Sequence, residues 1–578
     1  MRRGRITSHA AVLAFALAGV SCATKPPLSV YPNAILLDQG PRWNDVTRAS
    51  FYAQDQGARI IPLAWLQALK QTNGQGFLND GLSRYGYLPN QPNGLPVGFV
   101  SVGTGRDAVV GMTCSACHTR QITVDNVPYR VDGGPAIVDF QSFLSDLDAA
   151  VGTVLSSDSA FADFATGALG HAPAPAETAQ LRQSVSGWYY PYHTLMSRAL
   201  PSTPWGPSRL DAVGMIFNRL TGLDIGSGTD RVIADNIRRA DAPVRYPFLW
   251  NSPVQDFTQW PGFAQNGSDL LALSRNVGEV YGVFAMYRPQ KNAAHVFGYD
   301  YLNGNSVNFS GLRTLNLLTK NLGPPKWPFA IDAGLATQGA AVFNRSIDAG
   351  GCVACHGIRP GQTRLGNATW ATPIQDVGTD SREYDVLSWT ASTGVLQGAR
   401  IPLVISSLQP VDKSINILTL SVVGSILQDF VPVLLAPRPG TLGAQAQTAT
   451  PSAEALVASP EAAQLRTAFR TAPQPKAAYE SRVLQGIWAT APYLHNGSVP
   501  TLADLLKPAA ERPASFPIGP AYDTSKVGLA ASQTVFGYTL QTTDCSDRNS
   551  GASRCGHEYG TTLPDADKRA LLEYLKSL

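Results

Sequence analysis

"GMTCSACHTR" (Gly111–Arg120) and "AGGCVACHGI" (Ala349–Ile358) are the two stretches of this sequence that decide its fold. Each contains two cysteines three positions apart, with a histidine directly behind them. In a chain of 578 residues with 7 cysteines and 8 histidines, chance predicts about 0.001 copies of such a motif. Two copies therefore indicate a functional pattern.

The spacing of the cysteines distinguishes three kinds of site. A thioredoxin-like redox site needs one Cys-x-x-Cys in a βαβ setting and no histidine behind it. A Cys₄ zinc site usually brings its cysteine pairs within about 15–20 residues, whereas the two motifs here are far apart. Covalently attached haem fits, because two thiols bond the porphyrin and the adjacent histidine ligates the iron. The predicted cofactor-binding residues are Cys114, Cys117 and His118 in the first motif and Cys352, Cys355 and His356 in the second.

The N-terminus predicts export. "MRRGR" is positively charged, "AAVLAFALAGV" is a short apolar core and "SCA" offers a small-residue cleavage site, so residues 1–23 have the pattern of a signal peptide. Lipid attachment at Cys22 is the alternative, for which Gly19 is a poor fit. We expect a periplasmic or secreted protein. An oxidising compartment would also favour a disulfide between Cys545 and Cys555.

Length and composition bound the organisation of the chain. A net charge of +3 with 15% charged residues argues against a strongly basic nucleic-acid-binding protein. The 42 prolines and 53 glycines indicate many loops. We predict a mainly α, loop-rich protein with a few short strands and two cytochrome c-like haem domains that carry long insertions. Residues 24–330 would hold the active haem and an aromatic-rich insertion, and residues 331–578 would hold a low-spin haem.

Local patterns suggest different surroundings for the two motifs. Apolar and polar residues alternate around the first motif, which predicts flanking strands. Before the second motif, "QGAAVFNR" (Gln338–Arg345) predicts a short helix, and Leu563–Leu578 predicts an amphipathic terminal helix. Gly339 and Tyr574 are candidates for a close crossing of these two helices. A helix before the motif and a terminal helix closing the domain form the plan of a small cytochrome c.

Two further segments of the second half are distinctive. Ile415–Ala436 is the longest apolar run after the signal peptide, but its polar residues and Pro432 make it a poor membrane span. It would form buried core or the wall of a hydrophobic tunnel. Residues near 436–475 are rich in Ala and Pro, and we expect them to be mobile.

The second axial ligand decides between an electron carrier and an enzyme, because an electron-transfer haem usually has both axial positions filled. No methionine follows the second motif, which leaves His557 or His495 as its second ligand. We favour His557, in the loop before the terminal helix, and place His495 beside the ligands. For the first haem, His171, His193, His295 and the upstream methionines lie in no ligand motif. We therefore expect one haem to be open to a small ligand such as O₂ or peroxide.

The sequence resembles the bacterial di-haem cytochrome c peroxidase superfamily, through its two motifs, "TAPYLHNGSVPTLADLL" and the late loop before the terminal helix. A histidine, His557, stands where the peroxidases carry a methionine. The chain is more similar to the rubber oxygenase branch, which includes di-haem dioxygenases of unsaturated fatty acids. The resemblance implies that His118 alone ligates an O₂-binding haem, while His356 and His557 ligate a low-spin one. It also implies an aromatic residue between the haems, best matched by Trp250 and next by Trp260, and an apolar residue, Phe263, near the O₂ side.

The function expected from these features is O₂ insertion at C=C bonds of a lipophilic substrate, an unsaturated fatty acid or polyisoprene. An apolar cavity walled by Phe257, Phe263 and part of Ile415–Ala436 would hold the alkene. Two alternatives stay open: a peroxidase that draws electrons from a small cytochrome, and a non-catalytic electron carrier. No distal acid–base residue for a peroxidase is obvious in the sequence. Calcium is compatible with the resemblance and does not follow from the residues.

Overall fold

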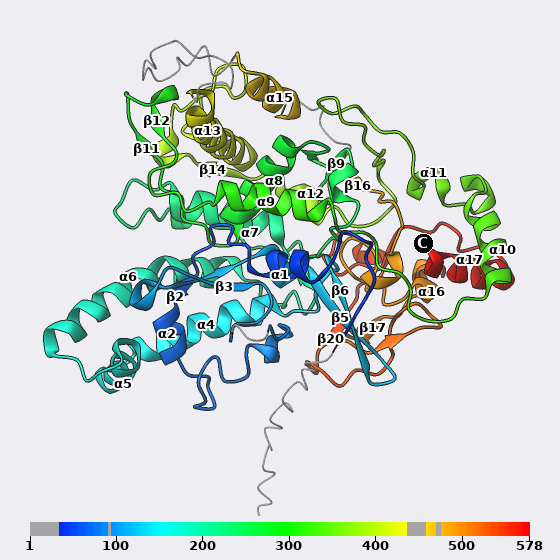
Figure 1. Cartoon of the computed structure of the whole chain (residues 1–578), viewed down its shortest axis with the longest axis horizontal. Helices are drawn as coiled ribbons and strands as arrows, with labels where there is room; N and C mark the ends of the chain where they lie inside the picture. The colour runs from blue at the N-terminus through cyan, green and yellow to red at the C-terminus, as the bar shows by residue number, and fades with distance from the viewer. Residues whose placement is uncertain (1–33, 91–93, 436–457, 470–475) are drawn as a thin grey trace, which may run out of the picture.

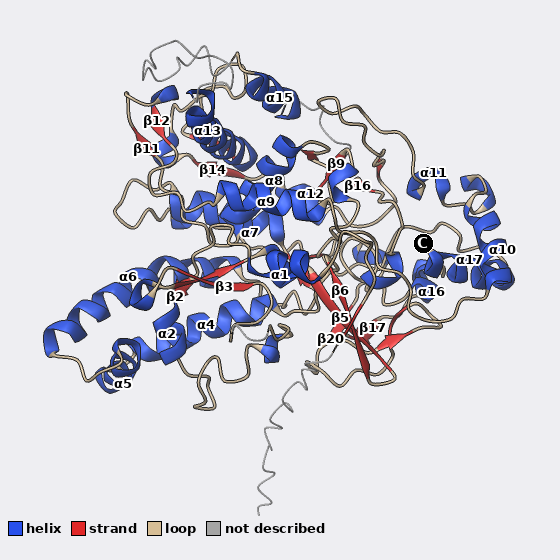
Figure 2. Cartoon of the chain, in the orientation of Figure 1, coloured by secondary structure: helices blue, strands red, loops and turns tan. Residues whose placement is uncertain are grey.

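The computed structural model describes residues 34–90, 94–435, 458–469 and 476–578. These residues form a mainly α, loop-rich structure with short strands, as the sequence predicts (Figures 1 and 2). Among them, the strands pair into two three-stranded and seven two-stranded sheets, and no strand is longer than six residues. The predicted signal peptide, Cys22 and much of the Ala/Pro-rich segment lie outside the described residues.

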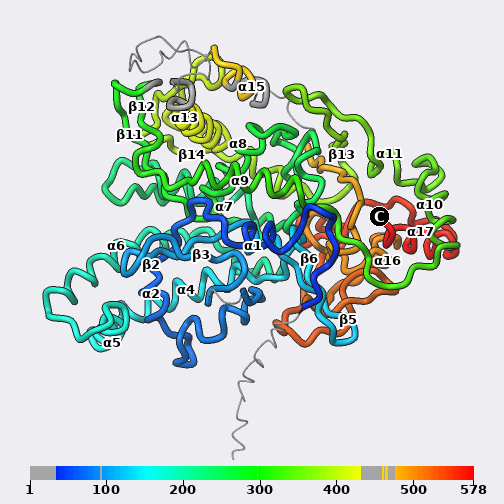
Figure 3. Tube along the Cα trace, viewed as in Figure 1, coloured from blue at the N-terminus to red at the C-terminus, as the bar shows by residue number. Residues whose placement is uncertain are grey.

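The helices gather in three groups (Figures 1 and 3). The first group lies at one end of the molecule and contains α2 (Leu63–Ala68), α4 (Phe140–Leu155), α5 (Asp158–Leu169) and α6 (Pro175–Ala199). The second contains α7 (Ala212–Arg219), α8 (Asp269–Gly282), α9 (Phe309–Thr319), α13 (Ser414–Leu435) and α15 (Pro460–Phe469). The third, at the opposite end, contains α10 (Ala333–Phe343) and α17 (Asp565–Ser577).

Strands flank the first motif, as its alternating pattern predicts. Its cysteines form the one-turn helix α3 (Cys114–Cys117) between two sheets. One sheet joins β2 (Ile61–Pro62), β3 (Phe99–Val102) and β4 (Val109–Met112), and the other joins β1 (Ile35–Leu36), β5 (Thr119–Val124) and β6 (Val127–Asp132). Gly98, directly before β3, lets the backbone there lie close to α3, because a Cβ on Gly98 would lie 2.6 Å from the Cβ of Ala116.

Two crossing helices support the second motif, as the sequence predicts. α10 packs against α17, and a Cβ on Gly339 would lie 2.7 Å from the Cβ of Tyr574. The buried side of α17 carries Leu571, Leu572 and Leu575, as its apolar spacing predicts. The end of α10 leads directly to the motif, because the Cys352 amide donates to the carbonyl of Phe343 over 2.9 Å.

The two halves of the chain share one hydrophobic cluster, which contains buried residues from both sides of residue 330. The β5–β6 hairpin also reaches into the second half, where the Thr123 amide donates to the carbonyl of Pro520 over 2.7 Å. Its two-residue turn at Asp125 and Asn126 has φ of 48° and 64°, a conformation that Asp and Asn tolerate well. The boundary near residue 330 stays a prediction.

The long apolar run forms α13, whose residues up to Leu427 are largely buried. It contacts α7, α8 and α15, so it belongs to the hydrophobic core. Its residues Leu418 and Val422 also line a cavity. Within the described ranges, no helix is both long enough and apolar enough to cross a membrane. Helix α15 falls inside the segment near 436–475 and packs on α8 and α13.

Candidate functional site

His118 faces the first of two pockets. Its Nδ1 lies 2.8 Å from the carbonyl oxygen of Pro247 and donates to it, which leaves Nε2 free toward the pocket. Burial lowers the pKa of His118 to about 4, so the imidazole is neutral near pH 7. A neutral ring with one nitrogen fixed by a backbone acceptor is the form in which histidine ligates a metal.

A polar cluster on α8 also lines the first pocket, where Arg275, Asn276 and Glu279 face it. The Glu279 carboxylate accepts a 2.8 Å hydrogen bond from Gln259 Nε2 and lies 3.7 Å from Arg275 Nε. Burial raises the pKa of Glu279, and Arg275 and the Gln259 hydrogen bond offset part of that rise. These side chains make the pocket polar, although the sequence predicts no acid–base residue near His118.

None of the other histidines expected near His118 lines this pocket. His171, His193 and His295 are exposed and contact the carboxylates of Glu177, Asp148 and Asp300, respectively. Among the described residues, the first pocket contains no histidine except His118 and no methionine. The open position expected opposite His118 stays a prediction.

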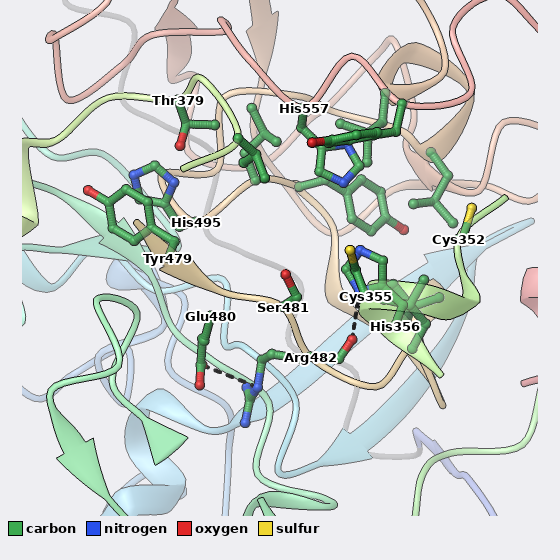
Figure 4. Close-up of a pocket in the computed structure, with 18 of the residues that line it drawn as sticks. Cys352, Cys355, His356, Thr379, Tyr479, Glu480, Ser481, Arg482, His495 and His557 are labelled. Atoms are coloured by element: carbon green, nitrogen blue, oxygen red, sulfur yellow. Dashed lines mark hydrogen bonds and ion pairs between the residues drawn. The ribbon is translucent and has the colours of Figure 1, made fainter. Parts of the chain in front are cut away.

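The second pocket brings His356 and His557 face to face (Figure 4). His356 Nδ1 donates to the carbonyl of Arg482 over 2.8 Å, which repeats the arrangement at His118. The ring centroids of His356 and His557 are 6.0 Å apart. Two imidazoles on opposite sides of one metal ion, with bonds of about 2 Å and centroids about 1 Å behind each nitrogen, give about 6 Å.

The wall of the second pocket is mostly apolar, whereas that of the first is polar. Burial lowers the pKa of His557 to about 3, with His356 and Arg512 adding to the effect, and burial also lowers the pKa of His356. Both rings are therefore neutral near pH 7. The remaining wall is mostly apolar and includes Ile347, Val377, Leu484, Ile487, Leu494, Leu502, Leu505, Leu506, Leu571 and Leu575.

Several contacts hold the loop that carries His557. Its amide donates to the carbonyl of Val377 over 2.7 Å. The buried Arg512 side chain donates to the carbonyls of Arg554, Gly556 and His557. The predicted disulfide between Cys545 and Cys555 is present and closes the loop just before the histidine.

His495 is engaged elsewhere, so the structure does not support it as an alternative ligand. It is 5% exposed, stacks on Tyr479 with centroids 3.8 Å apart, and its Nε2 lies 3.1 Å from an Asp380 oxygen. Figure 4 shows the ring beside Tyr479 and away from the facing pair His356 and His557. It still lines the second pocket, as expected for a residue beside the ligands.

Phe248 lines both pockets, whereas neither Trp250 nor Trp260, the aromatic residues predicted between the two sites, lines both. Trp250 is fully buried, donates to the carbonyl of Gln485 over 2.7 Å and stacks on Phe248 with centroids 4.8 Å apart. Trp260 lines the second pocket and lies 6.5 Å from the His495 ring. Phe248 is therefore the aromatic side chain common to both sites, and Trp250 supports it from behind.

A cavity of about 780 Å³ adjoins the first pocket. Gln259, Arg275 and Glu279 line both spaces. Phe263 belongs to the wall of this larger cavity and not to the pocket at His118. The other apolar wall residues include Ile216, Val404, Ile405, Leu408, Ile415, Leu418 and Val422. Part of the Ile415–Ala436 run thus forms a cavity wall, whereas Phe257 lies beneath the Arg364 guanidinium, outside the lining.

The two motifs fit covalently attached haem. Cys545 and Cys555 are bonded to each other, while the motif thiols Cys114, Cys117, Cys352 and Cys355 are all free. Each motif adds a histidine whose free nitrogen faces a pocket. Within the described ranges, no group of three or more His, Cys, Asp and Glu side chains is arranged to hold a metal ion by itself.

The residues that sequence reasoning missed are Phe248, Glu480, Arg482 and the cluster around Glu279. Arg275 and Glu279 are spaced four apart on an amphipathic helix, a signal for a side-chain pair. No local signal marks Glu480 and Arg482, because Arg482 meets Phe248 from the other half of the chain and Glu480 pairs with Arg482.

Comparisons with known proteins show one local family match and two relatives that cover more of the chain. Residues 478–517 match a family model described as RoxA-like, cytochrome c-like. The chain is 29% identical over 601 aligned positions to the uncharacterized protein y4iJ of Sinorhizobium fredii, covering 93% of this chain and 92% of that protein. It is 27% identical over 349 positions to the uncharacterized protein y4iM of the same organism, covering 57% and 63%. The cytochrome c-like match implies haem c and supports a RoxA-like haem family for this chain.

Proposed function

We propose that this protein is an exported di-haem c-type oxidoreductase that inserts O₂ at C=C bonds of a lipophilic substrate. Cys114, Cys117 and His118 would hold the first haem, and Cys352, Cys355, His356 and His557 the second. When bound, haem supplies O₂ activation and electron transfer. The RoxA-like match and the facing histidines of the second pocket support this assignment.

One observation carries the choice of an oxygenase: the cavity of about 780 Å³ shares three lining residues with the pocket at His118. Cavities of about 300–1,000 Å³ hold small-molecule ligands, and hydrogen peroxide needs no such space. The walls formed by Phe263, Leu418 and Val422 suit a hydrocarbon chain. A chain bound there would reach the first site past Gln259 and Glu279.

The residues at the junction have distinct tasks in this proposal. Gln259 donates to Glu279 and holds its carboxylate toward the junction. Glu279 lines both spaces and would act there as a general acid or base toward an oxygen atom of the substrate. Phe263 and the α13 residues Leu418 and Val422 would pack against the alkene.

Peroxide reduction is the second candidate, because Glu279 and Gln259 provide the polar groups that a peroxidase needs. A small cytochrome would then be the electron donor. The comparison of substrates separates the candidates: purified protein receives oleic acid, polyisoprene, or peroxide with a reduced cytochrome. O₂ uptake with a lipid supports the oxygenase, peroxide turnover alone supports the peroxidase, and inertness in every assay supports an electron carrier.

A variant that fills the cavity tests the proposal more directly. Val422→Phe adds bulk to the cavity wall without touching the first pocket. We expect lipid-dependent O₂ uptake to fall at least tenfold, while turnover of any small oxidant is unchanged. Val411→Phe is the control, because Val411 is 59% exposed and lies outside the cavity. Equal lipid-dependent rates in the two variants would show that the cavity does not hold the substrate.

A further inference from the structure

Arg482 lies between the two pockets and lines both, together with Phe248 and Glu480. Its side chain is buried, and the guanidinium lies 4.1 Å from the centroid of the Phe248 ring. No other arginine belongs to both linings among the described residues. The segment that carries Arg482 therefore forms the partition between the two sites, and Figure 4 shows its Glu480 and Arg482 side chains beside the second pocket.

A short series of hydrogen bonds runs through Arg482 from one motif histidine to the other. Its backbone carbonyl accepts from His356 Nδ1 over 2.8 Å. Its side-chain Nη1 donates to the carbonyl of Phe248 over 2.9 Å. Phe248 follows Pro247, whose carbonyl accepts from His118 Nδ1 over 2.8 Å. One residue thus holds the acceptor of His356 directly and the acceptor of His118 through a neighbouring peptide.

The remaining donors of Arg482 fix it in place. Nη2 donates to the Gln255 side-chain oxygen over 2.6 Å, and Nε lies 3.3 Å from Glu480 Oε1. The side chains of Glu480 and Arg482 are 1% and 5% exposed, so their charges are screened little by solvent. Their pairing keeps the partition close to neutral. Removing either partner would leave one buried charge beside both sites.

We infer that Arg482 is a positioning residue that couples the two haem sites, setting the hydrogen bonds of both motif histidines and the electrostatic potential at both irons. This inference rests on the proposed di-haem function. Partners behind a ligating histidine tune the metal, and buried charge shifts reduction potential. A positive charge beside an iron favours the reduced state, so loss of Arg482 should lower both midpoint potentials.

The test is a potentiometric titration of holo-protein, with each haem followed by absorption and electron paramagnetic resonance. Arg482→Met should shift the ferric-to-ferrous ratio of both haems at least tenfold toward ferric, a fall of about 59 mV for a one-electron couple. Glu480→Gln leaves the positive charge unpaired and should raise both potentials. Arg482→Lys restores the charge and should return both to within threefold of the original ratio.

Arg245→Met is the matched control, because Arg245 is also 5% exposed but lines the second pocket alone. It should shift the second haem only. An Arg482→Met protein that shifts one haem, or neither, would overturn the inference. If Arg482→Met does not accumulate, Glu480→Gln provides the test. A fall in either midpoint potential, or a shift at one haem only, would then overturn the inference. Haem content is measured first: fewer than two haems in the unaltered protein would overturn the proposed function itself, and the inference with it.

Discussion

Replacing Gly339 by alanine tests how far the crossing of α10 and α17 determines stability. A Cβ at Gly339 would lie 2.5 Å from the carbonyl carbon of Ala570 and 2.7 Å from Cβ of Tyr574. Carbon atoms in contact prefer about 3.5–4.0 Å, so the helices would have to separate by about 1 Å. Such overpacking costs about 1–3 kcal/mol, and contact with backbone places the cost at the upper end. Alanine regains about 1 kcal/mol through helix propensity, which leaves a net loss of about 2 kcal/mol.

Gly187→Ala is the control for this prediction, because Gly187 lies within α6 and no atom would approach its added Cβ within 4 Å. This variant keeps only the propensity gain, so its free energy of unfolding should rise by about 0.5–1 kcal/mol. Urea denaturation measures both changes. Hydrogen–deuterium exchange should increase in α10 and α17 of the Gly339 variant and nowhere in the Gly187 variant. Equal gains in stability for the two proteins would refute the argument from packing.

Three further perturbations test other parts of the structure. His557→Ala should convert one low-spin haem to high-spin in electron paramagnetic resonance, whereas His495→Ala should not, because His495 contacts Asp380 instead; the opposite pattern would reverse the ligand assignment. Replacing Cys545 and Cys555 by serine should lower the free energy of unfolding by about 3 kcal/mol, since the disulfide closes a loop with a sequence separation of 10; an unchanged urea midpoint would contradict this. Burial raises the pKa of Asp224 to about 7 from an ordinary 3.8, so the folded protein holds a proton that the unfolded chain releases. Its stability should therefore fall between about pH 4 and 7, and Asp224→Asn should lessen that fall by up to about 4 kcal/mol; parallel pH profiles would contradict the burial argument.

Local sequence patterns predicted the elements whose stability is local. The apolar spacing of Leu571, Leu572 and Leu575 predicted α17, and alternation around the first motif predicted β4 and β5. Gly339 could be assigned to a close crossing because only a missing side chain lets two helices approach so nearly. The cysteine pair at 545 and 555 was predictable from the oxidising setting and the short spacing.

Contacts between distant segments were not predictable in this way. The sequence left His495 as an alternative ligand, because the contacts of its ring with Asp380 and Tyr479 form only in the fold. Phe248 was passed over for Trp250, because a larger aromatic ring is a stronger signal in sequence, although Phe248 lines both pockets and Trp250 lines neither. Glu279 was missed because its role depends on the fold bringing α8 opposite His118. Such placements follow from tertiary packing, on which a single sequence carries no direct information.

The makeup of the second pocket sets an order of assembly. Its motif cysteines, Cys352 and Cys355, lie far upstream of Leu571 and Leu575, which belong to α17. Because Leu571 and Leu575 line the pocket, its wall is incomplete until α17 packs against α10. A protein without this helix would still present Cys352 and Cys355 for haem attachment, but a haem held there would be exposed to solvent. The packing of α17 on α10 is thus the step that completes the wall of the second pocket.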